Sequence, residues 1–443
     1  DQKYEPLYTY FPGADQDHRV YAASFVSMED GTGIVHIAPG YGEDDTELGK
    51  EHGLSLVDSV DEIGKLDPKI TVAENRYFKS ADKLIIADLT SRGLMFKSTT
   101  LTHSYPHCHR CETALLYKAQ TAWYIDIKKI KDQLLKTNQD INWVPSYFKE
   151  GRFKLGIESA PDWCISRSRY WGTPIPVWEC SCGEKIVAGS IAEIEKLSGQ
   201  KVTDLHRPAI DEITIKCPRC GQETKRIADV LDCWVESASM PYAQLHYPFE
   251  NEDKFQQNFP ADFITEYSAQ LRAWFYVMHV ISNALFGGVA FKNVIVNGTI
   301  MGNDGRKMSK SWGNYPDPKE MLEKLGADSL RLYLMGSPIV LGQDISISDQ
   351  DWATELKTTL MLLWNSYKYF VSYASLEGWE VVEEYDHAPS ELDRWILYRL
   401  DETVLEINKY LSDYQIPKAV TWLKDFVDDL STWYIRRSRD RVG

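Results

Sequence analysis

The sequence lacks the features of a membrane or secreted protein. Its 443 residues contain no run of about 18 apolar residues, so no membrane-spanning helix is expected. The first residues, Asp-Gln-Lys-Tyr, do not have the basic and then apolar pattern of a signal peptide. The apolar content of 43% is ordinary for a globular protein. We therefore expect a soluble, cytoplasmic protein with three or four domains of roughly 100–200 residues each.

An excess of positive charge is also lacking. The formal net charge of −16 excludes a nucleic-acid-binding surface that is basic all over. It does not exclude an RNA partner, because phosphate contacts need only local basic patches. The most basic patch is at residues 433–441, Trp-Tyr-Ile-Arg-Arg-Ser-Arg-Asp-Arg, where a solvated helix end is the alternative interpretation.

The cysteines do not suggest a disulfide framework. Six of the eight come in close pairs within a long chain, which favours metal sites in a reducing compartment. Two pairs flank a helix-like segment at residues 191–197 and together supply the four thiolates of a closed structural zinc site. The folding of the intervening module would then depend on the metal. The predicted zinc ligands are Cys180, Cys182, Cys217 and Cys220.

A third pair, Cys108 and Cys111, supplies only half of a tetrahedral site. His103, His107 or His109 could complete it, so zinc binding here stays open.

A basic loop lies between a strand-like segment and a helix start. Residues 305–314, Gly-Arg-Lys-Met-Ser-Lys-Ser-Trp-Gly-Asn, follow the apolar run at 294–296. Downstream, Asp317 and Pro318 are typical of a helix cap and first turn. In an open α/β sheet, a loop between a strand end and a helix start is where phosphates bind. Residues 259–266 predict a strand that leads into an amphipathic helix at 270–286.

Two strings give the sequence a family resemblance. Lys-Met-Ser-Lys-Ser at 307–311 resembles the second signature of class I aminoacyl-tRNA synthetases. The string at 163–174, Trp-Cys-Ile-Ser-Arg-Ser-Arg-Tyr-Trp-Gly-Thr-Pro, is more similar to isoleucyl enzymes than to valyl enzymes. The resemblance implies ATP-dependent activation of isoleucine, with Mg²⁺, and transfer to tRNA(Ile) by a monomeric enzyme.

The resemblance also implies residue roles. Lys307 and Lys310 would neutralise the leaving pyrophosphate, and Ser309 and Ser311 would add hydrogen bonds. The residues implied to contact the aminoacyl-adenylate are Glu266, Gln270, Trp234 and Trp274, and those implied to contact tRNA are Arg436, Arg437 and Arg439. The family often has Glu-Gly-x-Asp-Gln where this chain has Glu-Tyr-Ser-Ala-Gln at 266–270, and often has glycine where this chain has Ala238.

Residues 31–45 resemble part of an editing domain. We expect a strand that carries His36 and a glycine-bracketed turn that presents Asp44 and Asp45. By resemblance, Asp45 holds the substrate ammonium, and His36 and Thr32 line the hydrolytic pocket. Editing is needed because one methylene gives only about 1–3 kcal/mol of discrimination, and isoleucine against valine is the usual example of that limit. The threonine-rich segment that the family also uses is not found.

The predicted fold is a multidomain α/β protein that contains the second half of a Rossmann-like catalytic domain. The predicted parts are a partial β-rich editing domain at 1–117, a return segment at 118–178, a zinc-binding insertion at 179–228, the catalytic half at 229–345, a linker region at 346–385 and the start of a helical anticodon-binding domain at 386–443.

One family motif is missing from the sequence. No His-x-Gly-His string occurs, although class I synthetases carry one in the first half of the nucleotide-binding fold. We therefore expect a fragment with little activity in isolation. The alternatives are a valyl-tRNA synthetase fragment, a non-catalytic zinc-containing tRNA-binding module and, more remotely, a nucleotide-binding transferase unrelated to tRNA.

Overall fold

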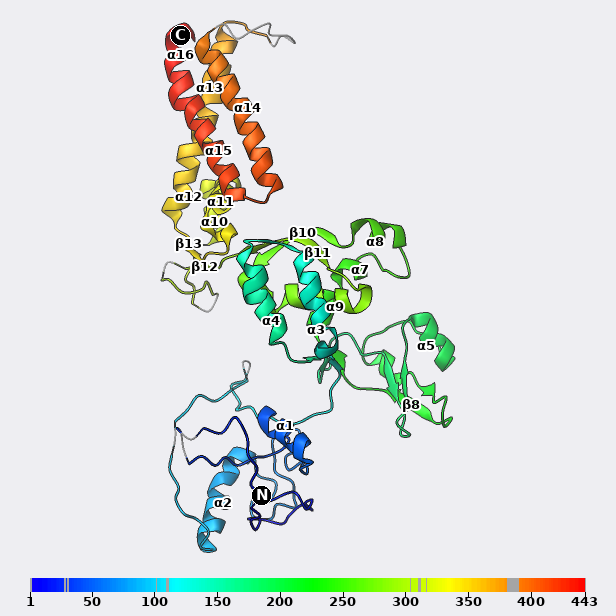
Figure 1. The fold of residues 1–443 in the computed structure, drawn as a ribbon. Coiled ribbons are helices and arrows are strands. Elements are labelled where there is room, and N and C mark those ends of the chain that lie inside the picture. Colours follow the sequence, from blue (N-terminus) through cyan, green and yellow to red (C-terminus); the bar gives the residue numbers. More distant parts are fainter. Residues whose placement is uncertain are drawn as a thin grey trace. The chain divides into compact units, whose positions relative to one another are not determined.

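The computed structural model describes residues 2–27, 29, 32–100, 102–108, 111–302, 304–309, 312–315, 317–380 and 390–442. It divides into two compact units, Asp1–Thr121 and Ala122–Gly443, and each is described by itself. Both units are drawn in Figure 1. In the described part of the chain, no helix has both the length and the apolar character needed to span a membrane.

The first unit has much less β-structure than the sequence suggested. It contains helices α1 (Glu43–His52) and α2 (Phe78–Ser91), and its described residues form isolated bridges such as Lys3 with Arg19 but no paired strand. The β-rich prediction for residues 1–117 and the predicted strand at His36 are therefore wrong. An extended segment becomes a strand only where a neighbouring backbone pairs with it, and residues 33–38 pair with no described segment.

The turn predicted at Asp44 and Asp45 is also wrong. Both residues lie in the first turn of α1, together with Glu43. Acidic side chains are favoured there because the N-terminal end of a helix carries partial positive charge. The helix ends at Gly53, whose φ of 65° is a left-handed conformation that glycine adopts without strain.

The second unit is built on a parallel three-stranded sheet. Its strand order is β10 (Ala261–Tyr267), β11 (Phe291–Asn297) and β2 (Asn142–Val144). Helices α9 (Trp274–Phe286) and α3 (Ile127–Thr137) contribute to the same core. Its largest fully buried side chains include Phe148, Phe153, Phe275 and Phe291.

The helix after β10 begins later than predicted. Residues Ser268–Arg272 form a 3-10 turn, and Ala273, with φ −131° and ψ −111°, separates this turn from α9. Within α9, His279 is fully buried, and its Nε2 lies 2.9 Å from the Leu134 carbonyl oxygen of α3. Burial lowers the pKa of His279 to about 4, so the ring is neutral and joins two core helices.

The region with two cysteine pairs forms a separate small sheet. Its antiparallel strand order is β6 (Lys185–Val187), β5 (Val177–Glu179), β8 (Glu223–Arg226) and β7 (Ile215–Lys216). Helix α5 (Ile191–Ser198) lies where the sequence predicted a helix. A second hydrophobic cluster surrounds Trp178, which is 0% exposed.

The chain continues into a set of helices, the longest of which lie side by side in Figure 1. They are α10 (Pro318–Leu325), α11 (Ala327–Gly336), α12 (Asp349–Glu355), α13 (Met361–Leu376), α14 (Glu391–Ser412), α15 (Ile416–Asp428) and α16 (Arg436–Val442), with π-helical turns at Leu356–Leu360 and Asp429–Ile435. The Asp317 side chain accepts from the backbone N–H of Lys319, which confirms the predicted start of α10.

Shorter elements complete the second unit. They are β1 (Tyr124–Ile125), β3 (Trp163–Cys164), β4 (Ser166–Arg167), β9 (Val230–Leu231), β12 (Ile300–Met301), β13 (Ile345–Ser346), α4 (Lys154–Glu158), α6 (Cys233–Ala238), α7 (Met240–Ala243), α8 (Glu252–Asn258), 3-10 turns at Asn138–Asp140, Ala209–Glu212 and Pro338–Leu341, and a π-helical turn at Lys149–Phe153.

Candidate active site and metal centre

The end of β10 presents the first candidate site residues. Glu266 and Tyr267 close this strand, and Tyr267 is paired in register with Asn297 of β11. Glu266 is exposed, and one of its carboxylate oxygens accepts from the Tyr267 backbone N–H at 3.1 Å. The carboxyl ends of parallel strands are where open α/β sheets bind ligands.

Three further candidates meet where α6 approaches α9. The side-chain oxygen of Gln270 accepts from the Trp274 backbone N–H at 3.0 Å, at the start of α9. The Trp274 indole N–H donates to the Ser237 carbonyl oxygen of α6 at 3.2 Å. Trp234 lies on the same helix and is 37% exposed. The structure therefore joins Gln270 and Trp274 directly and brings them to the helix that carries Trp234.

Asp232 is a site residue that was not predicted from the sequence. Its side chain is almost fully buried and accepts from the Trp234 backbone N–H at 3.2 Å, which caps α6. The same carboxylate accepts from the Trp163 indole at 3.2 Å and from the Arg167 guanidinium at 2.7 Å. An aspartate directly before a short helix is a capping signal that could have been used. Asp232 thus connects the segment at 163–174 with the start of α6.

A second connection between these segments runs through Glu236. Its carboxylate accepts from both the backbone N–H and the hydroxyl of Thr173, at 3.2 and 2.6 Å. The neighbouring Gly172 has a φ of 155°, and a Cβ there would lie 2.9 Å from a Val230 methyl carbon. Glycine is required at this position because it lets the turn approach β9.

The basic loop at residues 305–314, called the signature loop below, is organised by Asn314 and Asp304, whose roles were not predicted. The Asn314 side-chain oxygen accepts from the Ser309 backbone N–H at 3.0 Å, and its amide nitrogen donates to Asp304 at 2.9 Å. The same amide reaches the Lys307 carbonyl oxygen at 3.3 Å. The hydrogen bond from Asn314 lowers the pKa of the Asp304 carboxyl. A Cβ at Gly302 would overlap the Asn314 backbone oxygen, so glycine is needed where the two sides of the loop meet.

Of the two lysines in the signature, Lys307 lies within the described residues. Its backbone forms an antiparallel bridge with Met301, and its ammonium lies 3.4 Å from the Tyr267 hydroxyl and 4.8 Å from the centre of that ring. The structure therefore brings Lys307 to the strand end that carries Glu266. Lys310 and Ser311 lie outside the described residues.

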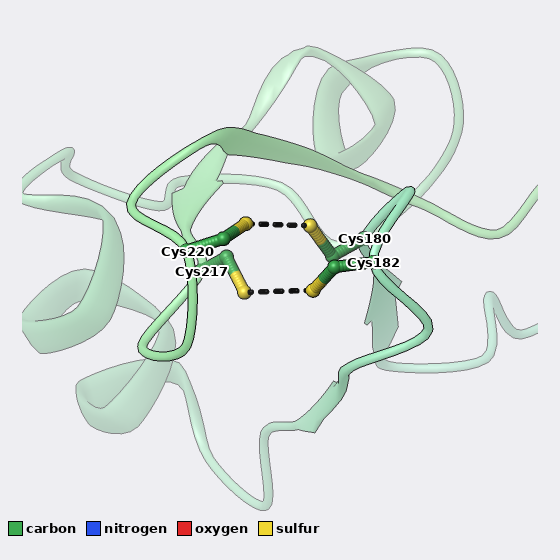
Figure 2. A group of neighbouring side chains, drawn as sticks. All are labelled: Cys180, Cys182, Cys217 and Cys220. Atoms are coloured by element: carbon green, nitrogen blue, oxygen red, sulfur yellow. Dashed lines mark hydrogen bonds between the residues drawn. The ribbon is translucent and has the colours of Figure 1, made fainter.

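The four cysteines predicted to bind zinc converge in space. Figure 2 shows Cys180 and Cys182 facing Cys217 and Cys220. The Cys180 and Cys220 sulfurs are 3.4 Å apart, those of Cys182 and Cys217 are 3.7 Å apart, and all four lie within 4.8 Å of one another. These distances exceed the roughly 2.05 Å of a disulfide bond. They match the separation of about 3.8 Å that a tetrahedral site with Zn–S bonds of about 2.3 Å requires.

The donor chemistry also suits zinc. The backbone N–H of Cys182 lowers the pKa of the Cys180 thiol to about 7. Despite the backbone N–H groups of Glu184 and Gln222, hydrogen bonds with the Cys180 sulfur raise the pKa of the Cys182 and Cys220 thiols, so one thiolate forms first and the close sulfurs share its charge. Cys111 is close to Cys108, and a hydrogen bond with Thr113 lowers the pKa of its thiol. Within the described residues, however, no third metal-ligand side chain joins this pair. His109 lies outside them.

The candidate editing residues do not meet around one cavity. His36 lines a cavity of about 1030 Å³ in the first unit, together with aromatic residues such as Tyr4, Tyr8 and Tyr21. Neither Thr32 nor Asp45 is among its lining residues. The Thr32 hydroxyl donates to the Ile34 carbonyl oxygen, and the Asp45 carboxylate lies over Gly42 at the start of α1.

The basic C-terminal segment forms α16. Arg436, Arg437 and Arg439 are exposed, and the Arg437 guanidinium lies 4.5 Å from the centre of the Trp433 ring. Arg441 is held differently, because it pairs with the nearly buried Asp393 of α14 at 2.7 Å. The hydrogen bond from Arg441 holds the pKa of the Asp393 carboxyl well below its usual range.

Comparisons with known proteins agree with this arrangement. The family described as class I tRNA synthetases (I, L, M and V) matches residues 24–348, and the anticodon-binding domain of tRNA ligases matches residues 393–443. The chain is 44% identical to the isoleucine–tRNA ligase of Treponema denticola and 46% identical to that of Chlamydia trachomatis serovar D. Each match covers 99% of this chain but only 42% of the relative's length.

Solved structures agree on the fold. Two solved structures of Mycobacterium tuberculosis methionyl-tRNA synthetase with methionyl-adenylate match with TM-scores of 0.54 and 0.55. They are 18% and 19% identical to this chain and cover 77% of it, and the chain covers 58% of each of them. A family model that matches residues 24–348 accounts for most of the chain, and the protein belongs to the class I tRNA synthetases of the I, L, M and V group.

Proposed function

We propose that the chain is the part of an isoleucine–tRNA ligase that holds the second half of its synthetic site. The observation that carries this proposal is the position of Lys307, whose ammonium lies against Tyr267, the residue that follows Glu266 at the carboxyl end of β10. The identity of 44–46% with isoleucine–tRNA ligases favours isoleucine as the amino acid.

The proposed chemistry proceeds in two steps. The isoleucine carboxylate attacks the α-phosphate of ATP and expels pyrophosphate. A hydroxyl of the terminal ribose of tRNA(Ile) then attacks the carbonyl carbon of the adenylate, and the acyl–phosphate bond breaks to release AMP. Such a reaction depends on positioning and charge stabilisation, so the protein needs no nucleophile of its own. Lys307 and Lys310 would neutralise the magnesium-bound pyrophosphate, with Ser309 and Ser311 as further donors.

The amino acid would bind between the sheet end and α6. The exposed Glu266 carboxylate could accept from the substrate ammonium. Trp274 and Trp234 offer apolar surface to an aliphatic side chain, and their positions are supported by the hydrogen bonds to Ser237 and Asp232. Gln270 would act partly through its bond to the start of α9.

Three further roles belong to the same proposal. The four converging cysteines would hold a structural zinc ion, which leaves no open coordination position for catalysis. Arg436, Arg437 and Arg439 would contact tRNA phosphates. In the first unit, His36, Asp45 and Thr32 would contribute to the hydrolysis of misacylated valine, although Asp45 would need a different position to reach the cavity beside His36.

The proposal is tested by titrating the chain with non-hydrolysable isoleucyl- and valyl-adenylate analogues in a calorimeter. We expect tighter binding of the isoleucyl analogue and weaker binding after Glu266→Gln. A preference for the valyl analogue would support the valyl alternative instead. Because the sequence has no His-x-Gly-His motif, we expect ATP–pyrophosphate exchange with isoleucine to be very slow, and a rapid exchange would contradict this expectation.

The cysteine cluster and the exposed arginines of α16 favour a second candidate function. In this alternative, the chain is a non-catalytic, zinc-containing module that binds tRNA. A gel-shift titration with tRNA(Ile) would support it if the chain binds tRNA but neither adenylate analogue.

A further inference from the structure

We propose that Tyr267 is a positioning residue that docks the signature lysine, Lys307, at the end of β10. Tyr267 stands at the position where the sequence departs from the Glu-Gly-x-Asp-Gln pattern. A glycine there has no side chain to offer a neighbouring residue, whereas the tyrosine offers both an aromatic face and a hydroxyl.

The backbone of the loop brings Lys307 to this position. The antiparallel bridge with Met301 and the 2.7 Å hydrogen bond from the Gly302 N–H to the Arg306 carbonyl oxygen form a short ladder at the base of the loop. Asn314 closes the other side through its contacts with Ser309 and Lys307. The Lys307 side chain therefore projects from a constrained backbone.

The strand end holds Tyr267 equally firmly. The residue is paired with Asn297 in the parallel sheet, and its backbone N–H donates to Glu266 at 3.1 Å. The described contacts of the Lys307 ammonium are both with this tyrosine, at 3.4 Å to the hydroxyl and 4.8 Å to the ring centre. An ammonium within about 6 Å of an aromatic ring centre is attracted by the ring face.

This contact favours the docked position of the Lys307 side chain, but it is weak enough for a ligand to displace it. An exposed cation–π contact changes a population by about two- to fivefold. A phosphate oxygen binds an ammonium more strongly, through a charge-assisted hydrogen bond. Tyr267 thus keeps the cation at the carboxyl end of β10 until a phosphate group binds it.

The test measures the reactivity of the amine itself. The chain is briefly acetylated with sulfo-NHS-acetate, digested with Glu-C and analysed by mass spectrometry, with the exposed Lys319 of α10 as internal reference. We expect Tyr267→Ala to raise the acetylation of Lys307 relative to Lys319 by about two- to fivefold. Tyr267→Phe keeps the ring and should raise it less. Tyr398→Ala, which removes an exposed tyrosine from α14, should leave the ratio unchanged.

Equal ratios in the unmodified chain and Tyr267→Ala, with unchanged circular dichroism, would overturn the docking role. A second arm, which rests on the proposed function, adds magnesium pyrophosphate, and protection of Lys307 is expected. If the ratio responds to Tyr267→Ala but pyrophosphate protects no variant, docking is supported and the failure belongs to the proposed nucleotide site.

Discussion

Two turns in this molecule have the same cysteine spacing and matching backbone hydrogen bonds but different surroundings. In the first unit, the Cys108 N–H donates to the Thr113 carbonyl oxygen, and the Glu112 N–H donates to the Cys108 carbonyl oxygen. In the second unit, the Cys217 N–H donates to the Gln222 carbonyl oxygen, and the Gly221 N–H donates to the Cys217 carbonyl oxygen. The fifth residue of each turn is left-handed, with φ of 58° at Glu112 and 76° at Gly221.

The difference lies in what faces each turn. A second pair, Cys180 and Cys182, is brought to Cys217 and Cys220 by the pairing of β5 with β8. Within the described residues, the turn at Cys108 has no such partner. The comparison teaches that a Cys-x-x-Cys spacing specifies a local turn, whereas a metal site needs a second element that tertiary structure supplies.

The largest effect is expected on metal content. We expect about one zinc per chain by elemental analysis, none in Cys217→Ser and one in Cys108→Ser, because among the described residues the four-cysteine cluster alone provides a closed site. The apparent binding free energy of structural zinc is roughly 10–16 kcal/mol in zinc-finger peptides, so Cys217→Ser should also unfold the β5–β8 sheet, as seen by hydrogen exchange. Two zinc ions per chain would show that the Cys108 turn also holds metal.

The next effect concerns the core behind the cluster. Trp178 is 0% exposed, and its indole donates to the Ile213 carbonyl oxygen at 2.8 Å. Trp178→Ala should cost about 3–5 kcal/mol and weaken zinc binding, since folding and metal binding are linked. Val187→Ala is the matched control, because Val187 is an exposed residue of the same sheet. Competition with a zinc-binding dye measures both variants, and equal affinities would mean that the site forms without this core.

A third prediction separates local from tertiary contacts at α14. Asp393 forms a capping box with Ser390 and also accepts from Arg441 of α16. Arg441→Ala keeps the cap, so we expect faster hydrogen exchange in α16, corresponding to about 1–2 kcal/mol, and little change at the start of α14. The control is Arg437→Ala, because the described contact of Arg437 is with the Trp433 ring and not with Asp393.

The same pair predicts a pH dependence with a definite sign. The pKa of Asp393 is lower in the folded chain than the ordinary value of 3.8, so the pair stabilises the fold above that value. The contribution is lost as the pH falls through the lower folded pKa. The difference in exchange between the unmodified chain and Arg441→Ala should therefore be largest at neutral pH and shrink below about pH 4. A difference that grows on acidification would contradict this assignment.

The smallest effects are expected in the turns themselves. Gly221→Ala should cost about 1 kcal/mol, because a left-handed backbone disfavours a Cβ and no neighbour lies within 4 Å of it. Glu112→Gly removes the same strain from the other turn and should stabilise it by no more than about 1 kcal/mol. Zinc affinity reports the first change and hydrogen exchange at residues 108–113 reports the second. We expect Gly221→Ala to destabilise its turn and Glu112→Gly to stabilise its turn. If both substitutions destabilised the turns, or both stabilised them, the two turns would not share the same left-handed strain.

Predictions from sequence were reliable where a local signal decided the structure. The Asp317 cap, the strand at 294–296 and the helix at 191–197 were found because capping, β-branched runs and amphipathic spacing act within a few residues. The strand at His36 was wrong because pairing depends on a distant segment. The break at Ala273 was missed because the Trp274 backbone N–H is satisfied by the Gln270 side chain rather than by a continuous helix.

The sequence by itself determined the family, the cysteine turns and the elements that flank the signature loop, since each depends on residues close together in the chain. Only the tertiary structure joined the two cysteine pairs and placed Lys307 against Tyr267. It also gave Asp232 and Asn314 their partners. These contacts join residues whose approach depends on strand pairing and loop closure, and no short-range propensity specifies them.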